Sequence, residues 1–244
     1  MRLAVISDVH GNLPALEAVL AAIAGDGVDL TVNLGDLLSG YVQPVETADR
    51  LIGLGLPTVA GNHERQVLTL PEDELGLADR ITRSLIGAEH RAWMAGLPKT
   101  LTPAPGVLAF HGTPTDDLQY LLHTVDAAGT RDATLDEVLD RLGDAQARLF
   151  LCGHTHLAGQ LRLADGRLIV NPGSVGWPAY TSDEPLPHVI AAGTPHARYA
   201  LVDDVSGRWE AEFRQVVYPW DEAAARAEGF GRPGVAHALR TGTN

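Results

Sequence analysis

Residues 3–12 read Leu-Ala-Val-Ile-Ser-Asp-Val-His-Gly-Asn, and this stretch decides the fold. Its four leading apolar residues stop abruptly at a Ser-Asp pair, a pattern typical of a short strand that is buried on both faces. Apolar residues then recur at helical spacing over residues 13–23, and Gly25 is suited to the helix exit. Because a second apolar run follows at residues 30–34, the N-terminal segment predicts a βαβ unit.

The same pattern of a short apolar run followed by a polar motif recurs further along the chain. We expect strands at residues 57–60, 107–110, 149–152 and 168–170. Helical periodicity predicts helices over residues 45–54, 64–96 with a break at Pro71, and 132–142. Asp132 or Thr134 is the expected cap of the last helix. This alternation of strands and helices predicts an α/β protein.

Toward the C-terminus the pattern changes from single apolar runs to alternation. Residues 199–202 and 209–217 alternate between apolar and polar about a turn at Ser206 and Gly207. This spacing predicts a β-hairpin, and an antiparallel hairpin added to parallel strands makes the sheet mixed.

The irregular parts of the chain leave its domain organisation simple. Residues 178–195 are rich in proline and are interpreted as either a lid over a site or an inert surface loop. No linker divides the chain. We therefore expect a single domain over residues 1–230 and a C-terminal surface extension over residues 231–244.

Composition narrows the class of protein. The chain carries 18 Lys and Arg against 31 Asp and Glu, a net charge of −13, so a nucleic-acid polymer is not an expected partner. Cys152 is the only cysteine, which excludes an intrachain disulfide and favours a reducing, cytoplasmic compartment. No apolar run reaches the about 20 residues of a membrane span or the about 7–15 of a secretory signal, so we expect no membrane partner.

Polar side chains with metal-binding chemistry follow directly on the predicted strands. They are Asp8, His10, Asp36, Asn62, His63, His111, His154 and His156. Because the carboxyl ends of the strands in an open α/β sheet meet at one crevice, we expect these side chains to converge. A purely structural network is the alternative, but burying carboxylates without a cation costs on the order of several kcal/mol per ion. The oxygen and nitrogen donors suit two divalent ions.

Five short blocks carry a resemblance to a known family. They are Ser7-Asp8-Val9-His10-Gly11-Asn12, Gly35-Asp36, Gly61-Asn62-His63-Glu64, His111-Gly112 and Gly153-His154-Thr155-His156. In order and spacing, from residue 3 to about residue 175, they closely resemble the calcineurin-like metallophosphoesterase superfamily. The resemblance implies a four-layer α/β/β/α sandwich with two mixed β-sheets, and a metal centre on the loops at one edge.

The same resemblance implies a ligand set for two divalent ions. Asp8, His10, Asp36 and His156 would surround the first ion, and Asn62, His111, His154 and the bridging Asp36 would surround the second. Manganese is the first expectation, with iron, zinc, nickel or cobalt as alternatives. A hydroxide held between the ions would attack phosphorus in line.

Three further residues receive roles around this centre. The resemblance makes His63 the general acid that protonates the leaving group, oriented by a carboxylate such as Asp8. The plainer interpretation is that His63 only positions Asn62. Asn12 and Arg65 are candidate donors to the substrate phosphate, and their plainer interpretations are a turn residue and a solvated charge.

Departures from the superfamily pattern limit the substrate. Protein Ser/Thr phosphatases of this superfamily carry an Arg before the Gly-Asn-His-Glu block and an Asp-Arg-Gly after the Gly-Asp, where this chain has Ala60 and Leu37-Leu38-Ser39-Gly40. We therefore expect a phosphoesterase for small phosphodiesters or phosphomonoesters. The alternatives are a hydrolase of dinucleoside polyphosphates and, more distantly, a non-catalytic scaffold. The sequence leaves the oligomeric state open.

Overall fold

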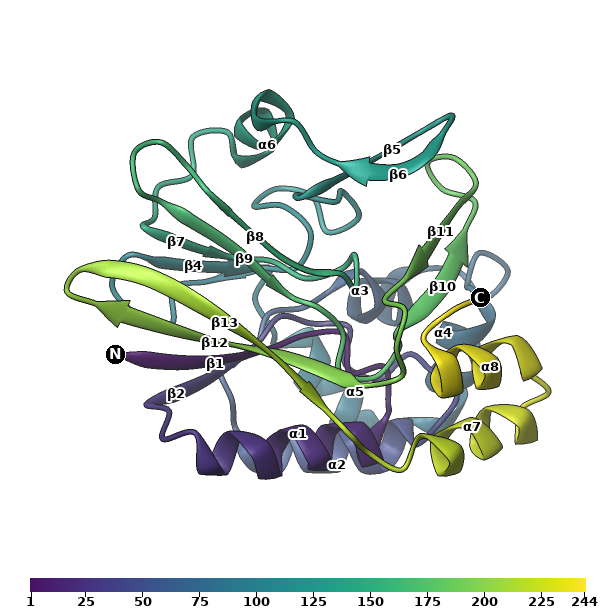
Figure 1. Cartoon of the computed structure of the whole chain (residues 1–244). Coiled ribbons are helices and arrows are strands. Elements are labelled where there is room, and N and C mark those ends of the chain that lie inside the picture. Colours follow the sequence, from purple (N-terminus) through teal and green to yellow (C-terminus); the bar gives the residue numbers. More distant parts are fainter.

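Strand β1 (Arg2–Ile6) lies in the interior of a four-stranded sheet. It pairs in parallel with β2 and antiparallel with β12, so the sheet is mixed, as the sequence predicts. From edge to edge this sheet contains β13 (Arg208–Val216), β12 (Ala197–Val205), β1 and β2 (Leu30–Asn33). The second mixed sheet contains β3 (Thr100–Leu101), β4 (Val107–Phe110), β7 (Leu149–Leu151), β9 (Leu168–Pro172) and β8 (Ala158–Arg162). Figure 1 shows this computed structural model, which describes residues 1–244.

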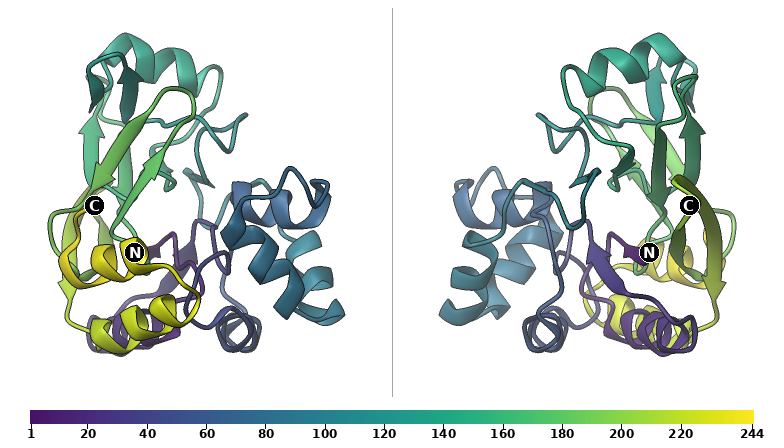
Figure 2. Two further views of the ribbon diagram at one scale, coloured as in Figure 1. Left: turned by 90° about the vertical axis from the view of Figure 1, so that its right-hand side faces the viewer. Right: turned by 90° about the vertical axis from the view of Figure 1, so that its left-hand side faces the viewer.

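Helices cover the outer faces of the two sheets, which gives the four layers α/β/β/α (Figure 1). Beside the four-stranded sheet lie α1 (Leu13–Gly25), α2 (Pro44–Leu54) and α7 (Trp220–Gly229). Helix α6 (Leu135–Leu142) covers the five-stranded sheet. Figure 2 shows a further group standing to one side, which contains α3 (Asn62–Thr69), α4 (Leu77–Leu85) and α5 (Ala88–Ala95). None of the helices combines the length and the apolar character needed to cross a lipid bilayer.

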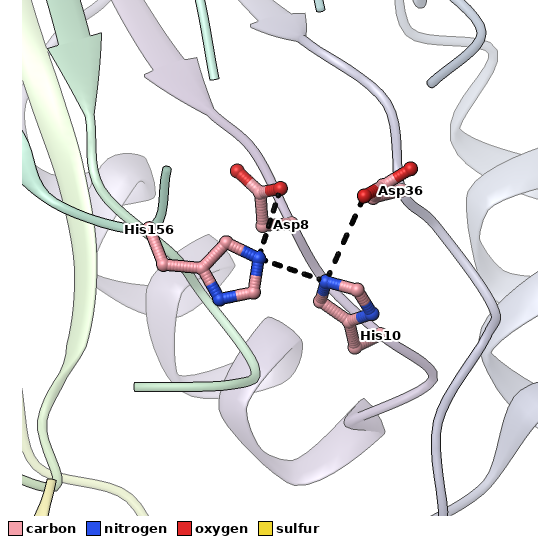
Figure 3. Close-up of side chains that lie close together, drawn as sticks. All are labelled: Asp8, His10, Asp36 and His156. Carbon is pink, nitrogen blue, oxygen red and sulfur yellow. Dashed lines mark hydrogen bonds and ion pairs between the residues drawn. The ribbon is translucent and has the colours of Figure 1, made fainter. Parts of the chain in front are cut away.

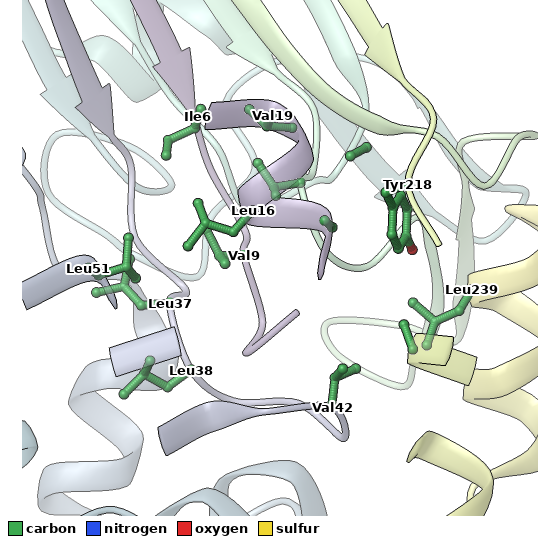
Figure 4. Close-up of a cluster of buried hydrophobic side chains, with 14 of the residues drawn as sticks. Ile6, Val9, Leu16, Val19, Leu37, Leu38, Val42, Leu51, Tyr218 and Leu239 are labelled. Atoms are coloured by element: carbon green, nitrogen blue, oxygen red, sulfur yellow. The ribbon is translucent and has the colours of Figure 1, made fainter. Parts of the chain in front are cut away.

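Alternate side chains of the central strands enter different cores. In β1, Leu3 and Val5 point into the core between the two sheets. Ala4 and Ile6 point the other way, into the core beneath α1, where Figure 4 shows Ile6. In β7 the middle residue, Phe150, packs instead against α6. Because both faces of these strands are buried, they appear in the sequence as unbroken apolar runs.

Most predicted strands are present within two residues of their expected bounds, but the one at residues 57–60 is not. Only Thr58 pairs there, through a single parallel bridge to Asn33. Pro57 has no N–H to donate, and the N–H of Ala60 donates to the carbonyl of Pro98 instead. The ladder therefore ends after one bridge.

Two predicted helices differ from the structure in their bounds. Residues 64–96 form three helices, because the chain is interrupted near Pro71 and again at Gly87. Helix α6 is capped by Thr134, whose hydroxyl accepts the N–H of Glu137 at 3.3 Å. Asp132 is not the cap, because it ends strand β6 (Gly129–Asp132), which pairs with β5 (His123–Asp126).

The C-terminal part of the chain is more regular than the sequence predicts. Residues 178–195 contain a hairpin of β10 (Ala179–Ser182) and β11 (His188–Ala191). Residues 231–244, expected to be a surface extension, form helix α8 (Pro233–Thr241), whose Leu239 is buried in the core beneath α1. The side chain of Asn244 also donates to two backbone carbonyls of the hairpin, at 3.1 and 3.0 Å. The division of the chain at residue 230 stays a prediction.

Replacing Phe150 with alanine tests the packing of the outer helix layer. The side chain is 0% exposed. We expect Phe150→Ala to lower the free energy of unfolding by about 3–5 kcal/mol, measured by urea denaturation, because burial is lost and a cavity remains. Val217→Ala is the control, since Val217 is 67% exposed, and it should change stability by less than about 0.5 kcal/mol. A loss below about 1 kcal/mol for Phe150→Ala would contradict this packing.

Candidate metal centre

The loops that follow β1, β2 and β7 bring two carboxylates and two imidazoles together. Asp8, His10, Asp36 and His156 are all buried, and one ligand atom from each lies within 4.8 Å of the others (Figure 3). His10 Nε2 lies 3.1 Å from His156 Nε2 and 3.9 Å from Asp36 Oδ2. His156 Nε2 lies 3.3 Å from Asp8 Oδ1. The four side chains therefore surround one small volume.

A second group of ligand atoms shares Asp36 with the first. Ligand atoms of Asp36, His111 and His154 also lie within 4.8 Å of one another. His111 Nε2 is 3.1 Å from Asp36 Oδ2. Asn62, at the start of α3, lines the same pocket as Asp36 and His154. The structure thus brings all seven predicted ligands to one region of the molecule.

Backbone carbonyls fix which ring nitrogen of each histidine faces the cluster. The bonds join His10 Nδ1 to Ser39 O at 2.6 Å, His111 Nδ1 to Leu34 O at 2.7 Å, His156 Nδ1 to Trp177 O at 2.6 Å and His154 Nε2 to Leu118 O at 2.9 Å. A carbonyl can only accept, so the N–H of each ring lies on that side. Burial lowers the pKa of His10 to about 3 and that of His154 to about 4, so both rings are neutral and can offer a lone pair.

The donor set fits a divalent cation. The Nε2 atoms of His10 and His156 face each other although both rings have already placed an N–H on a carbonyl. Three buried atoms of the cluster lack a well-aligned hydrogen bond: Asn62 Oδ1, Asp8 Oδ1, which lies 3.3 Å from His156 Nε2, and His111 Nε2, which lies 3.1 Å from Asp36 Oδ2. Such atoms are rare in folded proteins, and all three are of the oxygen and nitrogen types that divalent ions bind. A cation among them would satisfy these lone pairs.

Backbone strain is concentrated at the same residues. Six residues other than glycine have a positive φ, and five of them are candidate ligands: Asp8 (57°), His10 (49°), Asp36 (53°), His154 (69°) and His156 (58°). The left-handed region costs a residue with a Cβ roughly 1–2 kcal/mol. Such strain persists only where the surrounding structure enforces it, and it clusters at functional sites. The strained backbone therefore marks these loops as a candidate functional site.

Glu64 holds the two motif loops against each other, a role that the sequence analysis did not predict. Its buried carboxylate accepts the N–H groups of Asp36 and Leu37 at 2.9 Å and that of Gly61 at 2.8 Å. The N–H of His63 donates to Asp36 Oδ1 at 3.1 Å. The loop after β2 and the start of α3 are thus tied together around the shared carboxylate.

His63 lies at the edge of the cluster and is held by Asp79 of α4. Its Nδ1 is 2.6 Å from Asp79 Oδ1, and its Nε2 is 3.9 Å from Asp36 Oδ2. Burial lowers the pKa of His63, but the charges of Asp36 and Asp79 outweigh burial and raise it to about 10. A carboxylate orients this ring, as expected, but it is Asp79 and not Asp8, whose Oδ2 accepts the N–H of His154 at 3.2 Å. No motif or strand end marks Asp79 in the sequence.

Asn12 and Arg65 do not face the main pocket. Asn12 is fully buried and caps α1: its Oδ1 accepts the N–H of Ala15 at 3.2 Å, and its Nδ2 donates to the Tyr218 hydroxyl at 3.3 Å. Asn12 is therefore a buried helix cap and does not line the main pocket. Arg65 makes two hydrogen bonds to the carboxylate of Asp117, at 2.7 and 2.6 Å, and lines a smaller pocket. The polar groups of both side chains therefore form hydrogen bonds within the protein.

A pocket of about 1170 Å³ opens over the cluster. The first strand of the hairpin β10–β11 and the turn after it form part of its wall, so part of the segment 178–195 borders the candidate centre. Hydrogen bonds hold this wall in place, since the Tyr120 hydroxyl lies 2.6 Å from the Tyr180 hydroxyl and 2.9 Å from His188 Nε2. No sequence motif contains Tyr120, Tyr180 or His188, so their place in this wall is visible only in the structure.

Comparison with known proteins places this chain in a family. Residues 1–192 match the model of the calcineurin-like phosphoesterase superfamily domain. The chain belongs to this superfamily. It is similar to an uncharacterized protein of Methanocaldococcus jannaschii, with 28% identity over 200 residues, 72% of this chain and 76% of that protein.

Two solved structures are similar to the whole chain. A metallophosphoesterase from Sphaerobacter thermophilus is 26% identical, with a TM-score of 0.76 over 100% of both chains. A hypothetical protein from Pyrococcus horikoshii is 18% identical, with a TM-score of 0.77 over 100% of this chain and 99% of that one. The predicted fold class is confirmed. The family supports a phosphoesterase in general and implies divalent metal ions.

Metal loading should stabilise the folded protein. The ligand atoms converge only in the folded chain, so manganese binds the folded state alone. At about 100 times its dissociation constant, manganese should raise the free energy of unfolding of the metal-free protein by about 2.7 kcal/mol, seen as a rise in Tm. Asp36→Asn should abolish most of this shift, because Asp36 belongs to both ligand groups. Asp132→Asn is the control, since that side chain is 98% exposed. Equal shifts for wild type and Asp36→Asn would rule out this centre.

Proposed function

We propose that this chain is a dinuclear metal-dependent phosphoesterase that hydrolyses small phosphodiesters or phosphomonoesters. One observation carries the proposal: the buried carboxylate of Asp36 belongs to two separate groups of candidate ligands. In dinuclear hydrolases, shared ligands hold two ions about 3.5–4 Å apart. Membership of the phosphoesterase superfamily supports this assignment.

The ligand groups divide between two ions. Asp8, His10, Asp36 and His156 would hold the first ion, and Asn62, His111, His154 and Asp36 would hold the second. When bound, such ions lower the pKa of water to supply a nucleophile and neutralise charge on the phosphoryl oxygens. Manganese is the first expectation, with iron, zinc, nickel or cobalt as alternatives, because nitrogen and oxygen donors do not select strongly among them.

His63 delivers the proton to the leaving group in this proposal. Its Nδ1–H donates to Asp79, and the raised pKa of the ring favours a second proton, which Nε2 carries on the side of the candidate metal centre. The leaving oxygen accepts this proton as its bond to phosphorus breaks. Asp79 is only 4% exposed and acts as a positioning residue that keeps the ring in one orientation.

Substrate comparison tests the reaction class. Manganese-loaded protein should hydrolyse bis(p-nitrophenyl) phosphate, and metal-free protein should not. A hydrolase of dinucleoside polyphosphates is the second candidate, because the pocket of about 1170 Å³ exceeds the about 300–1,000 Å³ of ordinary ligand sites. Faster turnover of a dinucleoside tetraphosphate than of every simple ester would favour that candidate.

The leaving group reveals whether His63 donates a proton. An alkoxide of high pKa cannot depart unprotonated, whereas nitrophenolate needs little help. His63→Asn should therefore lower turnover by roughly 10²–10⁴-fold on alkyl or nucleoside esters and by clearly less on nitrophenyl esters. Metal content, measured by mass spectrometry, should stay unchanged. Equal losses on both ester types, with metal retained, would show that His63 does not act as the acid.

Asp79→Asn should weaken the same step without touching the metal ligands. Asparagine retains the shape of the side chain but not its charge, so we expect a loss of about 10–100-fold on alkyl esters, as for other partners that orient functional histidines. Asp49→Asn is a matched control, because Asp49 bonds His90 at 2.9 Å outside the pocket. If both variants kept full turnover, Asp79 would have no positioning role.

A further inference from the structure

The pocket over the candidate metal centre is larger than a simple phosphate ester needs. Its volume is about 1170 Å³, and it extends from His10 and His63 to the C-terminal helix α8, where Arg232 and Val235 line the wall. A phosphate held at the metal centre would leave most of this volume for the rest of the substrate. The side chains of the wall therefore decide which substrates bind.

Two arginines line this pocket, and the guanidinium of Arg232 makes no hydrogen bond to the protein. The other, Arg141, donates to three backbone carbonyls and to the hydroxyl of Thr124. Arg232 forms no ion pair and no side-chain hydrogen bond, and its guanidinium carbon lies 5.3 Å from the centre of the Tyr41 ring. Stacking on an aromatic face orients the guanidinium plane and leaves its N–H donors free.

Ring contacts connect Arg232 with the candidate metal centre. The Tyr41 ring lies 5.7 Å from that of Trp177, which in turn lies 5.1 Å from the ring of His10. Tyr41 is buried, so this chain of contacts is part of the packed structure. By these contacts the guanidinium carbon lies no more than about 16 Å from the centre of the His10 ring, and Arg232 and His10 line the same pocket.

We propose that Arg232 binds a second anionic group, a carboxylate or a phosphate, on the substrate whose scissile phosphate occupies the metal centre. This assignment rests on the proposed function of that centre. The planar guanidinium fork matches the oxygens of both groups and binds them in bidentate geometry. Residue 232 lies beyond the matched family domain at residues 1–192, so the preference comes from the C-terminal segment of this chain.

Acidic side chains in the same pocket restrict the substrate to a short one. Glu74, Asp116 and Glu184 also line the pocket, and none of them forms an ion pair. Their charges repel a long polyanion such as a nucleic-acid strand. These charges favour a short substrate, and Arg232 is the residue that would bind its one further anionic group.

Paired chromogenic diesters test the assignment. Each is a p-nitrophenyl phosphodiester whose second arm is either a plain alkyl chain or the same chain ending in a carboxylate, prepared over a series of chain lengths. The scissile bond and the leaving group are then identical. For manganese-loaded wild type we expect, at the best length, a KM about tenfold lower for the carboxylate arm, as one charge-assisted contact provides. Arg232→Gln should remove this difference with kcat unchanged, and Arg232→Lys should restore part of it.

Binding without turnover provides the second measurement. Calorimetric titration compares a non-hydrolysable alkyl phosphonate with the bisphosphonate of the same chain length. Manganese-loaded wild type should bind the bisphosphonate about tenfold more tightly, and Arg232→Gln should bind both alike. Arg226→Gln is the control, because it removes an exposed arginine of α7 that does not line the pocket, with the same change in net charge.

The outcomes separate the two proposals. No preference for the second anion in wild type, or an equal preference in wild type and Arg232→Gln, overturns the assignment of Arg232. Absence of hydrolysis of every diester and of p-nitrophenyl phosphate, together with a bisphosphonate preference that depends on Arg232, overturns the proposed function and supports the binding role of Arg232.

Discussion

Asp36 Oδ2 lies 3.1 Å from His111 Nε2 and 3.9 Å from the Nε2 atoms of His10 and His63, and the carboxylate is almost wholly buried. Burying the negative charge of Asp36 is costly unless a positive charge lies beside it. The surrounding residues hold the carboxylate and the imidazoles in the positions where such a charge could bind. Glu64 fixes the backbone on both sides of Asp36, and carbonyls hold the N–H groups of the neighbouring imidazoles away from it.

The layered core makes this arrangement rigid enough to hold strained loops. Strands β1 and β2 are packed between a helix layer and the second sheet, so the points at which their loops begin cannot shift. The strained left-handed backbone at Asp8, His10 and Asp36 persists because the packed strands and helices hold the loops in place. The cores therefore contribute to function by enforcing loop conformations that the loops would not adopt alone.

The pocket combines the ligand-bearing loops with elements that lie far away in the chain. Hairpin β10–β11 and helix α8 form its walls, and Asn244 and the Tyr120–Tyr180 pair tie these walls to their neighbours. Residues 1–192 match the family domain, whereas α8 lies beyond it. The pocket over the candidate metal centre is thus built partly from the matched family domain and partly from the segment that follows it.

The sequence by itself determined the central strands, helix α1, the hairpin β12–β13 and the set of side chains at the strand ends. These features depend on local periodicity and on short motifs, which survive in a linear sequence. Only the tertiary structure decided the rest. Asp79 pairs with His63 because α4 packs against α3, Asn12 is used up as a helix cap, and α8 closes the pocket because Leu239 enters a core formed mostly by distant segments. Such partners are chosen by packing between elements, and no local pattern of residues records which elements will meet.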